Sequence, residues 1–501
     1  MRLDYLLNGQ QILERRGNEN PEIKGLASDS RLVKKGYLFV AVKGNSQDGH
    51  MYLTHAVQKG ACALLVEKMG DNFQNVPVVR LPDTRTVLSE LASRFYNYPS
   101  QGMNLIGITG TNGKTTTSYI LESILKEEGK NVGVIGTINY RFQEKSVPAS
   151  LTTPESHEIM RIISEMRDAG VTDVIVEVSS HSLAQGRIKG LNWSRALFTN
   201  FSRDHLDYHA TMAEYFKAKS LLFSSLKQNE GSDQIKAIIN MDDPKGRVLE
   251  KITKAPVVRY GLGDDCLLRA VDIHFSKEGL HFKLVTPAGD VSITSALVGQ
   301  MNVYNILAAA AVAFSLDINI NSISRGIQNL TFVPGRLQCI NNKQGLSVFV
   351  DYAHSSDALE KLLQTVRQIS KGRLITVFGC GGDRDKGKRP HMGKIAGMYS
   401  DCVIITSDNP RGENPSKIAD EIVPGLKQSG LKRVALDDLS NKRGYEIILN
   451  REKAIHAAVT IAKKGSKGII VIAGKGHETY QIMGNRKRYF DDVEVVKLAA
   501  S

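Results

Sequence analysis

The stretch that constrains this chain most is a glycine-rich turn between an apolar run and a helical pattern. Residues 104–109 (NLIGIT) predict a β-strand, residues 110–117 (GTNGKTTT) a turn, and residues 118–128 a helix. In this arrangement, backbone N–H groups and the positive end of the helix dipole point at one anion. Lys114 would bridge the outer phosphates of a nucleotide, and the Thr115 hydroxyl would ligate Mg²⁺. The predicted nucleotide-binding residues of the loop are Gly110, Thr111, Asn112, Gly113, Lys114, Thr115 and Thr116.

The loop departs from the strict P-loop pattern at one position. That pattern has a glycine six residues before the lysine, where this chain has Ile108, with Gly107 and Gly110 on either side. An ordinary strand-to-helix turn with a surface lysine is the alternative. We favour the phosphate loop because a polar run of this kind has few structural reasons to lie between a strand and a helix. The loop predicts a nucleoside triphosphate and Mg²⁺ but does not predict the reaction.

Length and composition bound the class of protein. A chain of 501 residues with 42% hydrophobic and 23% charged residues predicts a globular protein of three domains. We find no apolar run of membrane-spanning length and no signal-peptide pattern, so we expect no stable membrane insertion and a cytoplasmic location. The five cysteines are scattered and fit reduced thiols. The net charge of +13 is dispersed along the chain, which favours polyanionic small substrates over nucleic acid.

The order of the predicted elements indicates an α/β fold. Residues 1–100 form a small α/β unit, and residues 101–335 alternate apolar strands with helices around the phosphate loop. Within the second segment, residues 270–296 alternate in the manner of a short antiparallel insertion. Acids and histidines follow its parallel strands, at the sheet edge where ligands collect. These residues are Glu177, Asp204, His205 and His209. Together they predict a metal and nucleotide site.

A third α/β segment covers residues 336–501. It includes a predicted helix after Pro390. Polar loops follow four of its strands, at residues 351–354, 379–390, 408–415 and 474–480. Carboxyl ends of parallel strands meet at one sheet edge, so these loops predict a second substrate-binding face. Gly, Pro and Asp loops without a function are the alternative.

Taken together, the motifs resemble those of the ATP-dependent Mur ligases over essentially the whole chain. The motifs are, in order, GTNGKTTT, EVSSH, TNFSRDHLDYH, GxxNxxN, PGR, DYAH and GCGGDRDKGKRP. The resemblance implies three domains: a UDP-sugar-binding domain over residues 1–100, a P-loop ATPase domain with a mainly parallel sheet over residues 101–335, and a Rossmann-like amino-acid-binding domain over residues 336–501.

The resemblance also implies a reaction. The γ-phosphoryl group of ATP moves to the D-glutamyl carboxylate of UDP-MurNAc-L-Ala-D-Glu, and an amine attacks the acyl phosphate to give an amide. Family motifs place catalytic roles on Lys114, His205 and Lys219, with Lys219 carbamylated by CO₂. Two Mg²⁺ ions would be held by Thr115, Glu177, His205 and the Lys219 carbamate, and nucleotide contacts would come from Asn302, Arg336 and Asp351. His181, in EVSSH, receives no role.

The incoming amino acid implied by the resemblance is meso-diaminopimelate. Arg411 offers a rigid two-pronged donor for its distal carboxylate, and Glu478 could pair with its distal ammonium. The implied amino-acid contacts are Arg389, Asp408, Asn409, Pro410, Arg411, Gly474 and Glu478. The implied contacts to the UDP-linked acceptor are Ser28, Ser30, Asn45, Ser46, Gln47, Thr152, Thr153, Ser179, Gln185 and Arg187. Leu151 stands where some members of the family have asparagine.

Three alternatives remain open at this point. The same ligase could add L-lysine, or the chain could be a related ligase such as a folylpolyglutamate synthetase. A nucleotide-gated binding protein or nucleic-acid motor would also use a phosphate loop, but the dispersed charge argues against it. We expect a monomer.

Overall fold

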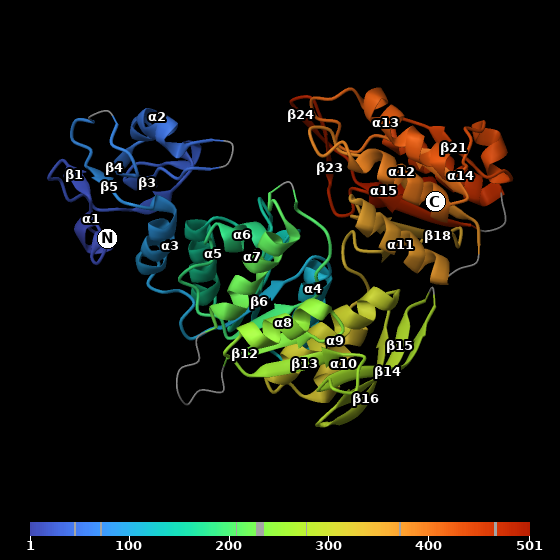
Figure 1. Cartoon of the computed structure of the whole chain (residues 1–501), viewed down its shortest axis with the longest axis horizontal. Coiled ribbons are helices and arrows are strands. Elements are labelled where there is room, and N and C mark those ends of the chain that lie inside the picture. Colours follow the sequence, from blue (N-terminus) through green and yellow to red (C-terminus); the bar gives the residue numbers. More distant parts are fainter. Residues whose placement is uncertain are drawn as a thin grey trace. The chain divides into compact units, whose positions relative to one another are not determined.

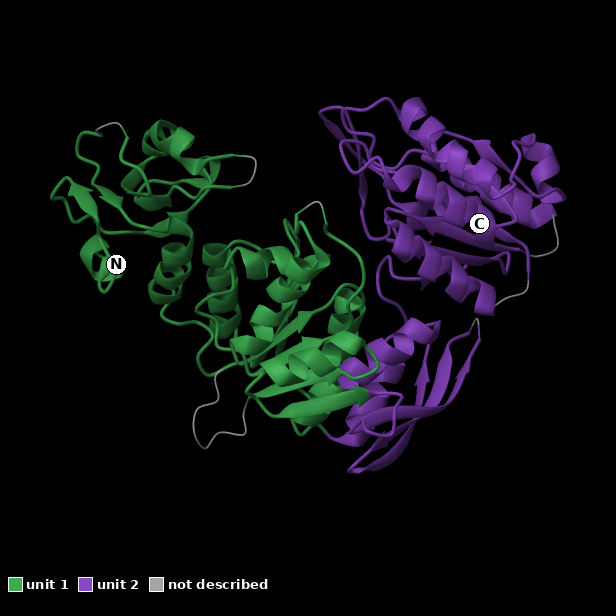
Figure 2. Cartoon of the chain, in the orientation of Figure 1, with its two compact units in different colours: residues 1–260, 311–318 green, residues 261–310, 319–501 purple. Residues whose placement is uncertain are grey.

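The computed structural model describes residues 1–44, 47–70, 73–206, 208–226, 235–276, 278–369, 372–464 and 468–501. The chain forms two compact units (Figure 2). Unit 1 consists of residues 1–260 and 311–318, and unit 2 of residues 261–310 and 319–501. No helix among the described residues is both long and apolar enough to cross a lipid bilayer.

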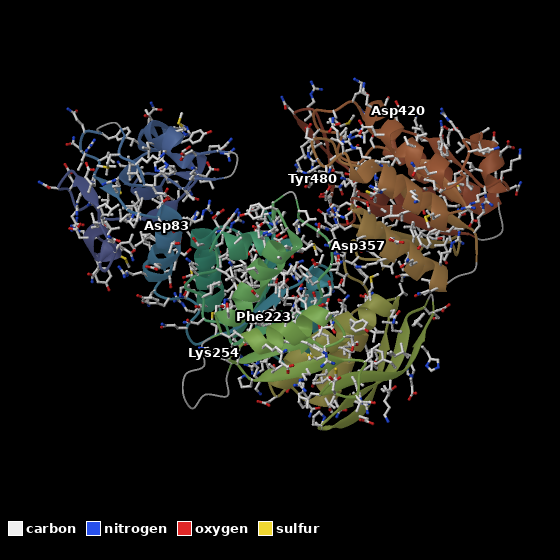
Figure 3. The ribbon with its side chains drawn as sticks, viewed as in Figure 1. Asp83, Phe223, Lys254, Asp357, Asp420 and Tyr480 are labelled. Carbon is white, nitrogen blue, oxygen red and sulfur yellow. The ribbon has the colours of Figure 1, made fainter. Side chains whose placement is uncertain are left out.

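Unit 1 begins with a five-stranded sheet in the order β1-β5-β4-β3-β2. Strand β1 is antiparallel to its neighbour, and the other pairs are parallel. Asp83, labelled in Figure 3, begins helix α3 by accepting a hydrogen bond from the Thr86 amide, which satisfies a free N–H of the first turn. The elements are α1 (Leu3–Leu7), β1 (Glu14–Arg16), β2 (Gly25–Ala27), η1 (Ser30–Leu32), β3 (Tyr37–Val40), η2 (Gly49–Tyr52), α2 (Leu53–Gln58), β4 (Ala61–Val66), β5 (Val78–Arg80) and α3 (Thr84–Phe95).

The second sheet of unit 1 contains the phosphate loop. Its strands follow the order β13-β12-β11-β6-β10-β7-β8-β9, with β6 at the centre (Figure 1). Strands β6, β7, β10, β11, β12 and β13 are parallel, and the ribbon β8–β9 is antiparallel. The elements are β6 (Asn104–Thr109), α4 (Lys114–Glu127), β7 (Val132–Ile135), β8 (Asn139–Phe142), β9 (Lys145–Pro148), α5 (Ser156–Asp168), β10 (Asp173–Glu177), α6 (Ser180–Ala184), β11 (Arg195–Phe198), α7 (Met212–Ser224), β12 (Lys236–Asn240), α8 (Pro244–Ile252) and β13 (Val257–Gly261).

Unit 2 begins with an antiparallel meander of β14 (Leu268–Phe275), β15 (Leu280–Thr286) and β16 (Gly289–Ser295). The antiparallel insertion predicted over residues 270–296 is therefore confirmed. Helices α9 (Gln300–Ser315) and α10 (Ile320–Asn329) follow it.

The largest sheet of unit 2 has the order β17-β18-β22-β19-β20-β21. Strands β18, β22, β19, β20 and β21 are parallel, and separate apolar clusters cover the two faces, as in a doubly wound fold. The elements are β17 (Gln338–Cys339), β18 (Ser347–Asp351), α11 (Ser356–Ile369), β19 (Leu374–Phe378), α12 (Lys388–Tyr399), β20 (Cys402–Ile405), α13 (Pro415–Gln428), η3 (Leu436–Ser440), β21 (Gly444–Ile447), α14 (Arg451–Lys464), β22 (Ile469–Ala473), β23 (Tyr480–Met483), β24 (Arg486–Tyr489) and α15 (Asp492–Ala499).

This architecture confirms the predicted α/β class. One boundary was wrong: the helix expected after Pro390 is α12, which begins at Lys388. Proline is tolerated within the first turn of a helix, because the amide that it lacks would have no acceptor there, so Pro390 does not mark the start.

Candidate active site

The two glycines of the phosphate loop adopt positive φ values, as the predicted turn requires. Gly110 has φ of +146° and Gly113, which begins α4, has φ of +89°. A Cβ atom on Gly110 would lie 1.9 Å from Thr199 Oγ1, so no larger residue fits this turn. Lys114 Nζ donates to the carbonyls of Gly110 and Thr111 at 2.9 and 3.0 Å. The lysine thus lies over the loop at the positive end of α4, where an anion is stabilised.

A buried carboxylate faces the start of α4. Glu177, the last residue of β10, is 1% exposed, and its Oε2 accepts hydrogen bonds from the hydroxyls of Thr115 and Thr137, both at 2.8 Å. The Thr137 amide donates to Glu177 Oε1 at 3.1 Å. A hydroxyl and a carboxylate are the oxygen ligands that Mg²⁺ takes while keeping several waters. No group of three or more His, Cys, Asp or Glu side chains in the described ranges is placed to hold a metal ion, so a site here would depend on these oxygens, water and phosphate.

Lys219 projects from α7 into the same loop. Its side chain is 1% exposed, and Nζ donates to the Gly110 carbonyl at 2.8 Å and lies 4.6 Å from the centre of the Tyr215 ring. Burial, and then the charge of Lys114, hold the pKa of the Lys219 amine well below its usual value. Lys217, two residues earlier, is exposed. The structure therefore separates a buried lysine suited to the neutral form from a solvated one.

Histidine and tyrosine rings cluster beside Lys219. The His181 ring lies 4.9 Å from that of His205 and 5.7 Å from that of His209, and the rings of His205 and His209 lie 5.8 and 5.3 Å from Tyr215. His205 is exposed and has φ of +53°, and its Nε2 lies 3.6 Å from Asp204. The structure thus connects the predicted residue His205 to Lys219 through the Tyr215 ring.

The predicted acceptor residues of the central sheet form a network at Glu177. Thr153 Oγ1 donates to the Glu177 carbonyl at 2.8 Å and accepts from the Ser179 amide at 3.0 Å. Arg187 Nη1 donates to the Thr153 carbonyl at 2.9 Å, and Thr152 Oγ1 lies 3.2 Å from Thr137 Oγ1. The structure therefore brings these predicted side chains to the same strand end. Gln185 Nε2 donates to the Tyr208 hydroxyl at 3.1 Å.

The predicted UDP-binding residues lie on the first sheet. Ser30 begins η1, and its hydroxyl lies 2.9 Å from His55 Nδ1, whereas Ser28 directly follows β2. Gln47 is exposed, and its carbonyl accepts from the Gly44 amide at 2.8 Å. Asn45 and Ser46 lie outside the described residues.

Unit 2 contains the other predicted nucleotide contacts. Both carboxylate oxygens of Asp351 accept backbone hydrogen bonds, from Leu337 at 2.6 Å and Ala353 at 2.7 Å. Burial raises the pKa of Asp351, and the nearby Arg336 charge and these amides partly oppose the rise. Asn302 donates to the Val298 carbonyl at 2.8 Å. Asp351 and Asn302 therefore also hold their own loops in place, a role that the sequence did not indicate.

The DNPR loop, residues 408–411, meets the loop after β22. Glu478 Oε2 accepts from Asn409 Nδ2 at 2.8 Å, and a Cβ atom on Gly474 would lie 2.5 Å from Asp408 Oδ2. Arg411 is half-buried, has φ of +50° and donates from Nη1 to the Gly382 carbonyl at 2.9 Å. One of the two terminal nitrogens of the predicted two-pronged donor therefore already has a partner within the protein. The other terminal nitrogen, Nη2, could still bind a ligand.

Arg389, another of the predicted amino-acid contacts, lies in the first turn of α12. It is fully buried, and its terminal nitrogens bind Glu413 at 2.9 and 3.0 Å and Glu421 at 2.8 Å. A guanidinium held by two carboxylates is a strong structural element, and Arg389 Nε has no hydrogen-bond partner among the described residues. Pro410 contributes its carbonyl, which accepts from the Glu413 amide.

Sequence reasoning missed Thr137 and Tyr215 as residues beside this site, and it named His181 without giving it a role. Thr137 follows the parallel strand β7, so the rule that polar residues after parallel strands meet at one edge could have found it. Tyr215 had no comparable signal, because an aromatic residue on a helix usually belongs to the core.

Comparison with known proteins agrees with this geometry. Models of the Mur ligase family match three segments: the catalytic domain at residues 22–96, the Mur ligase middle domain at residues 108–313 and the glutamate ligase domain at residues 335–476. These matches, together with the relatives described below, define the class of protein as a ligase. The chain belongs to the Mur ligase family.

Relatives match along the whole chain. A UDP-N-acetylmuramoyl-L-alanyl-D-glutamate–2,6-diaminopimelate ligase of Geobacter metallireducens is 44% identical, covering 100% of this chain and 98% of the relative. A protein of the same name from Bacillus licheniformis is 43% identical over 99% of this chain and 98% of its own. A solved structure with that name has a TM-score of 0.68 at 31% identity and covers 100% of this chain and 98% of its own. A D-alanyl-D-alanyl-adding ligase from Acinetobacter baumannii, at 19% identity and TM-score 0.65 over 94% of both chains, shares the fold.

Proposed function

We propose that this protein is an ATP-dependent ligase that joins meso-diaminopimelate to the D-glutamyl carboxylate of UDP-MurNAc-L-Ala-D-Glu, in the synthesis of peptidoglycan precursors. The observation that carries the proposal is the match, at 43–44% identity and over 99–100% of the chain, to ligases named for this reaction. The DNPR loop with Arg411 and Glu478 supports the choice of amino acid.

Charge is the main difficulty of such a reaction, because a carboxylate and a triphosphate repel each other. Lys114, on the loop at the start of α4, is placed to hold phosphate oxygens. Mg²⁺ held by Thr115 and Glu177 would neutralise phosphate charge when bound. The carboxylate oxygen takes the γ-phosphoryl group and ADP leaves. The neutral amine nitrogen then bonds to the acyl carbon as the C–O bond to phosphate breaks, and inorganic phosphate and one amine proton are released.

Lys219 fits a carbamate, which the family resemblance predicts. A carbamate forms when a neutral amine bonds to CO₂ and loses one proton, and it provides a carboxylate-like metal ligand. The full burial of Lys219 and its lowered pKa supply the neutral amine. His205, connected to Lys219 by the Tyr215 ring, would complete the second of two Mg²⁺ sites.

Each substrate is assigned to one of the three segments predicted from the sequence. We assign the UDP-sugar to residues 1–100, ATP to residues 101–335 and the amino acid to residues 336–501, an assignment supported by the three family matches. Asn302, Arg336 and Asp351 would contact the nucleotide. We expect the protein to act as a monomer in the cytoplasm, and sedimentation of the purified chain tests the first point.

Phosphate release tests the proposal directly. We expect release with UDP-MurNAc-L-Ala-D-Glu, ATP, Mg²⁺ and meso-diaminopimelate, and far less with L-lysine. Lys114→Met should lower kcat by about 100-fold or more, as loss of a charge-stabilising donor does, whereas Lys130→Met, at an exposed lysine after α4, should not. Equal turnover of both amino acids would contradict the specificity. ATP hydrolysis stimulated by DNA or RNA, and not by the UDP-dipeptide, would contradict the ligase assignment.

A further inference from the structure

A fully buried lysine lies at the centre of the loop after β22. Lys475 is 0% exposed, and its Nζ lies 3.0 Å from Glu478 Oε2 and 3.4 Å from Asn409 Oδ1. The ring of Tyr480, labelled in Figure 3, lies 5.4 Å from the same nitrogen. A buried ammonium costs folding free energy unless it has partners of opposite charge. Lys475 is therefore held in this loop by its contacts with Glu478 and Asn409.

The two flanking glycines fix the position of Lys475. Gly474 has φ of +114° and Gly476 has φ of +54°, which is the left-handed region that favours glycine. A Cβ atom on Gly474 would lie 2.5 Å from Asp408 Oδ2, and one on Gly476 would lie 2.8 Å from the Tyr352 backbone. The Gly-Lys-Gly backbone thus packs directly against the Asp408 side chain and the Tyr352 backbone, and the Lys475 side chain between the glycines is fully buried.

Lys475 and its neighbours fix the orientation of Asn409. Asn409 Oδ1 accepts from the Ile482 amide at 2.9 Å and faces Lys475, so its Nδ2 must point the other way, where it donates to Glu478 Oε2 at 2.8 Å. Both donors to the Glu478 carboxylate, Lys475 and Asn409, reach Oε2. A substrate ammonium would therefore bind at Oε1.

We propose that Lys475 is a positioning residue that makes this site select an amino acid whose distal end has both an ammonium and a carboxylate. The inference rests on the proposed function and deepens it. Lys475 already offsets the charge of Glu478, so a lone ammonium gains little at Glu478. A distal carboxylate that binds Arg411 adds the negative charge that the site lacks, and its ammonium can then bind Glu478.

Two substitutions of Lys475 test the role. In Lys475→Met the charge and the donor are lost, and in Lys475→Gln a donor remains without the charge. For both variants we expect KM for L-lysine to fall about tenfold, the scale of one charge-assisted hydrogen bond, because Glu478 loses the partner that offsets its charge and can then bind a lone ammonium. KM for ATP and for the UDP-dipeptide should stay within about twofold. The ratio of kcat/KM for meso-diaminopimelate to that for L-lysine should fall about tenfold.

Lys487→Met is the matched control. Lys487 is an exposed lysine whose Nζ lies 3.8 Å from the centre of the same Tyr480 ring. Its removal changes the net charge equally and alters a contact to the same aromatic residue, but it does not touch Glu478. This variant should keep the wild-type KM values and the wild-type ratio.

Four results separate the possibilities. An unchanged ratio in a folded Lys475 variant, or an equal change in KM for the amino acids, ATP and the UDP-dipeptide, would overturn the positioning role. Because Lys475 acts through Glu478, Lys475→Met should add little to the effect of Glu478→Gln, and fully additive effects would also overturn it. A wild-type protein that does not use meso-diaminopimelate at all would instead contradict the proposed function.

Discussion

The hydroxyl of Thr115 donates a hydrogen bond of 2.8 Å to Glu177 Oε2, which joins the first turn of α4 to the end of β10. Glu177 lies opposite Ile108 in the parallel pair β6–β10, so the register of the central sheet sets this contact. A threonine oxygen that donates its proton to a carboxylate directs its lone pairs away from it. Under the proposed function, Glu177 would therefore orient the Thr115 oxygen toward a metal at the phosphate loop, in addition to offering its own carboxylate.

The first prediction concerns this orientation. Glu177→Gln should raise the Mg²⁺ concentration for half-maximal phosphate release by about tenfold or more, because partners that orient ligands typically contribute 10–100-fold to metal affinity. A Mg²⁺ titration of the reaction measures it. The control is Asp173→Asn, the same chemical change at the other end of the same buried strand. An unchanged Mg²⁺ requirement in Glu177→Gln would contradict the role.

The sequence predicted the elements of this site because their signals are local. The apolar run of β6, the glycines at residues 110 and 113 and the polar residues after parallel strands predicted that Lys114 follows the loop and that Glu177 ends a parallel strand, as the structure has them. The sequence did not predict contacts that no motif marks. The Asp351 carboxylate accepts a hydrogen bond from the Leu337 amide, 14 positions away. Arg389 binds Glu413 and Glu421, which are 24 and 32 positions away. No local pattern encodes such pairs, since folding and not spacing decides them.

The second prediction concerns Lys219. With ¹³C-labelled bicarbonate and Mg²⁺, the wild-type protein should show one carbamate resonance that Lys219→Met lacks. Because the amine pKa is lowered, the neutral form that reacts with CO₂ becomes populated at a lower pH than for an ordinary lysine, so the signal should already be present near neutral pH and grow as pH rises. Lys217→Met, at an exposed lysine on the same helix, should keep the signal. A resonance that persists in Lys219→Met would refute the assignment.

The third prediction concerns Arg411. Arg411→Ala should lower kcat/KM for meso-diaminopimelate by about 10–100-fold, the cost of losing hydrogen bonds between charged groups, and should leave the weak turnover of L-lysine nearly unchanged. Arg433→Ala is the control, since Arg433 is an exposed arginine of the same unit that pairs with Glu446. An equal loss of kcat/KM for both amino acids would show that Arg411 supports the loop through its hydrogen bond to Gly382 and does not bind the distal carboxylate.

The fourth prediction concerns the pH dependence of stability. Nδ1 of His157, in the first turn of α5, is buried and has no hydrogen-bond partner in the described part of the chain. Burial, and then the charge of Arg161, lower the pKa of His157 to about 4 from 6.5. Between these two pH values the unfolded chain binds a proton that the folded chain does not, so folding stability falls as pH drops through this window.

The loss should be at most about 3 kcal/mol, the free energy of a shift of two to three pKa units, and smaller to the extent that water reaches the ring. The variant His157→Gln does not titrate at this position. Urea unfolding followed by the fluorescence of Trp193, the single tryptophan and a buried residue of unit 1, reports on this part of the protein. Relative to the variant, the wild type should be less stable at pH 5 than at pH 7.5. A difference between the two proteins that stays constant over this range would mean that the folded state protonates His157 as readily as the unfolded chain does.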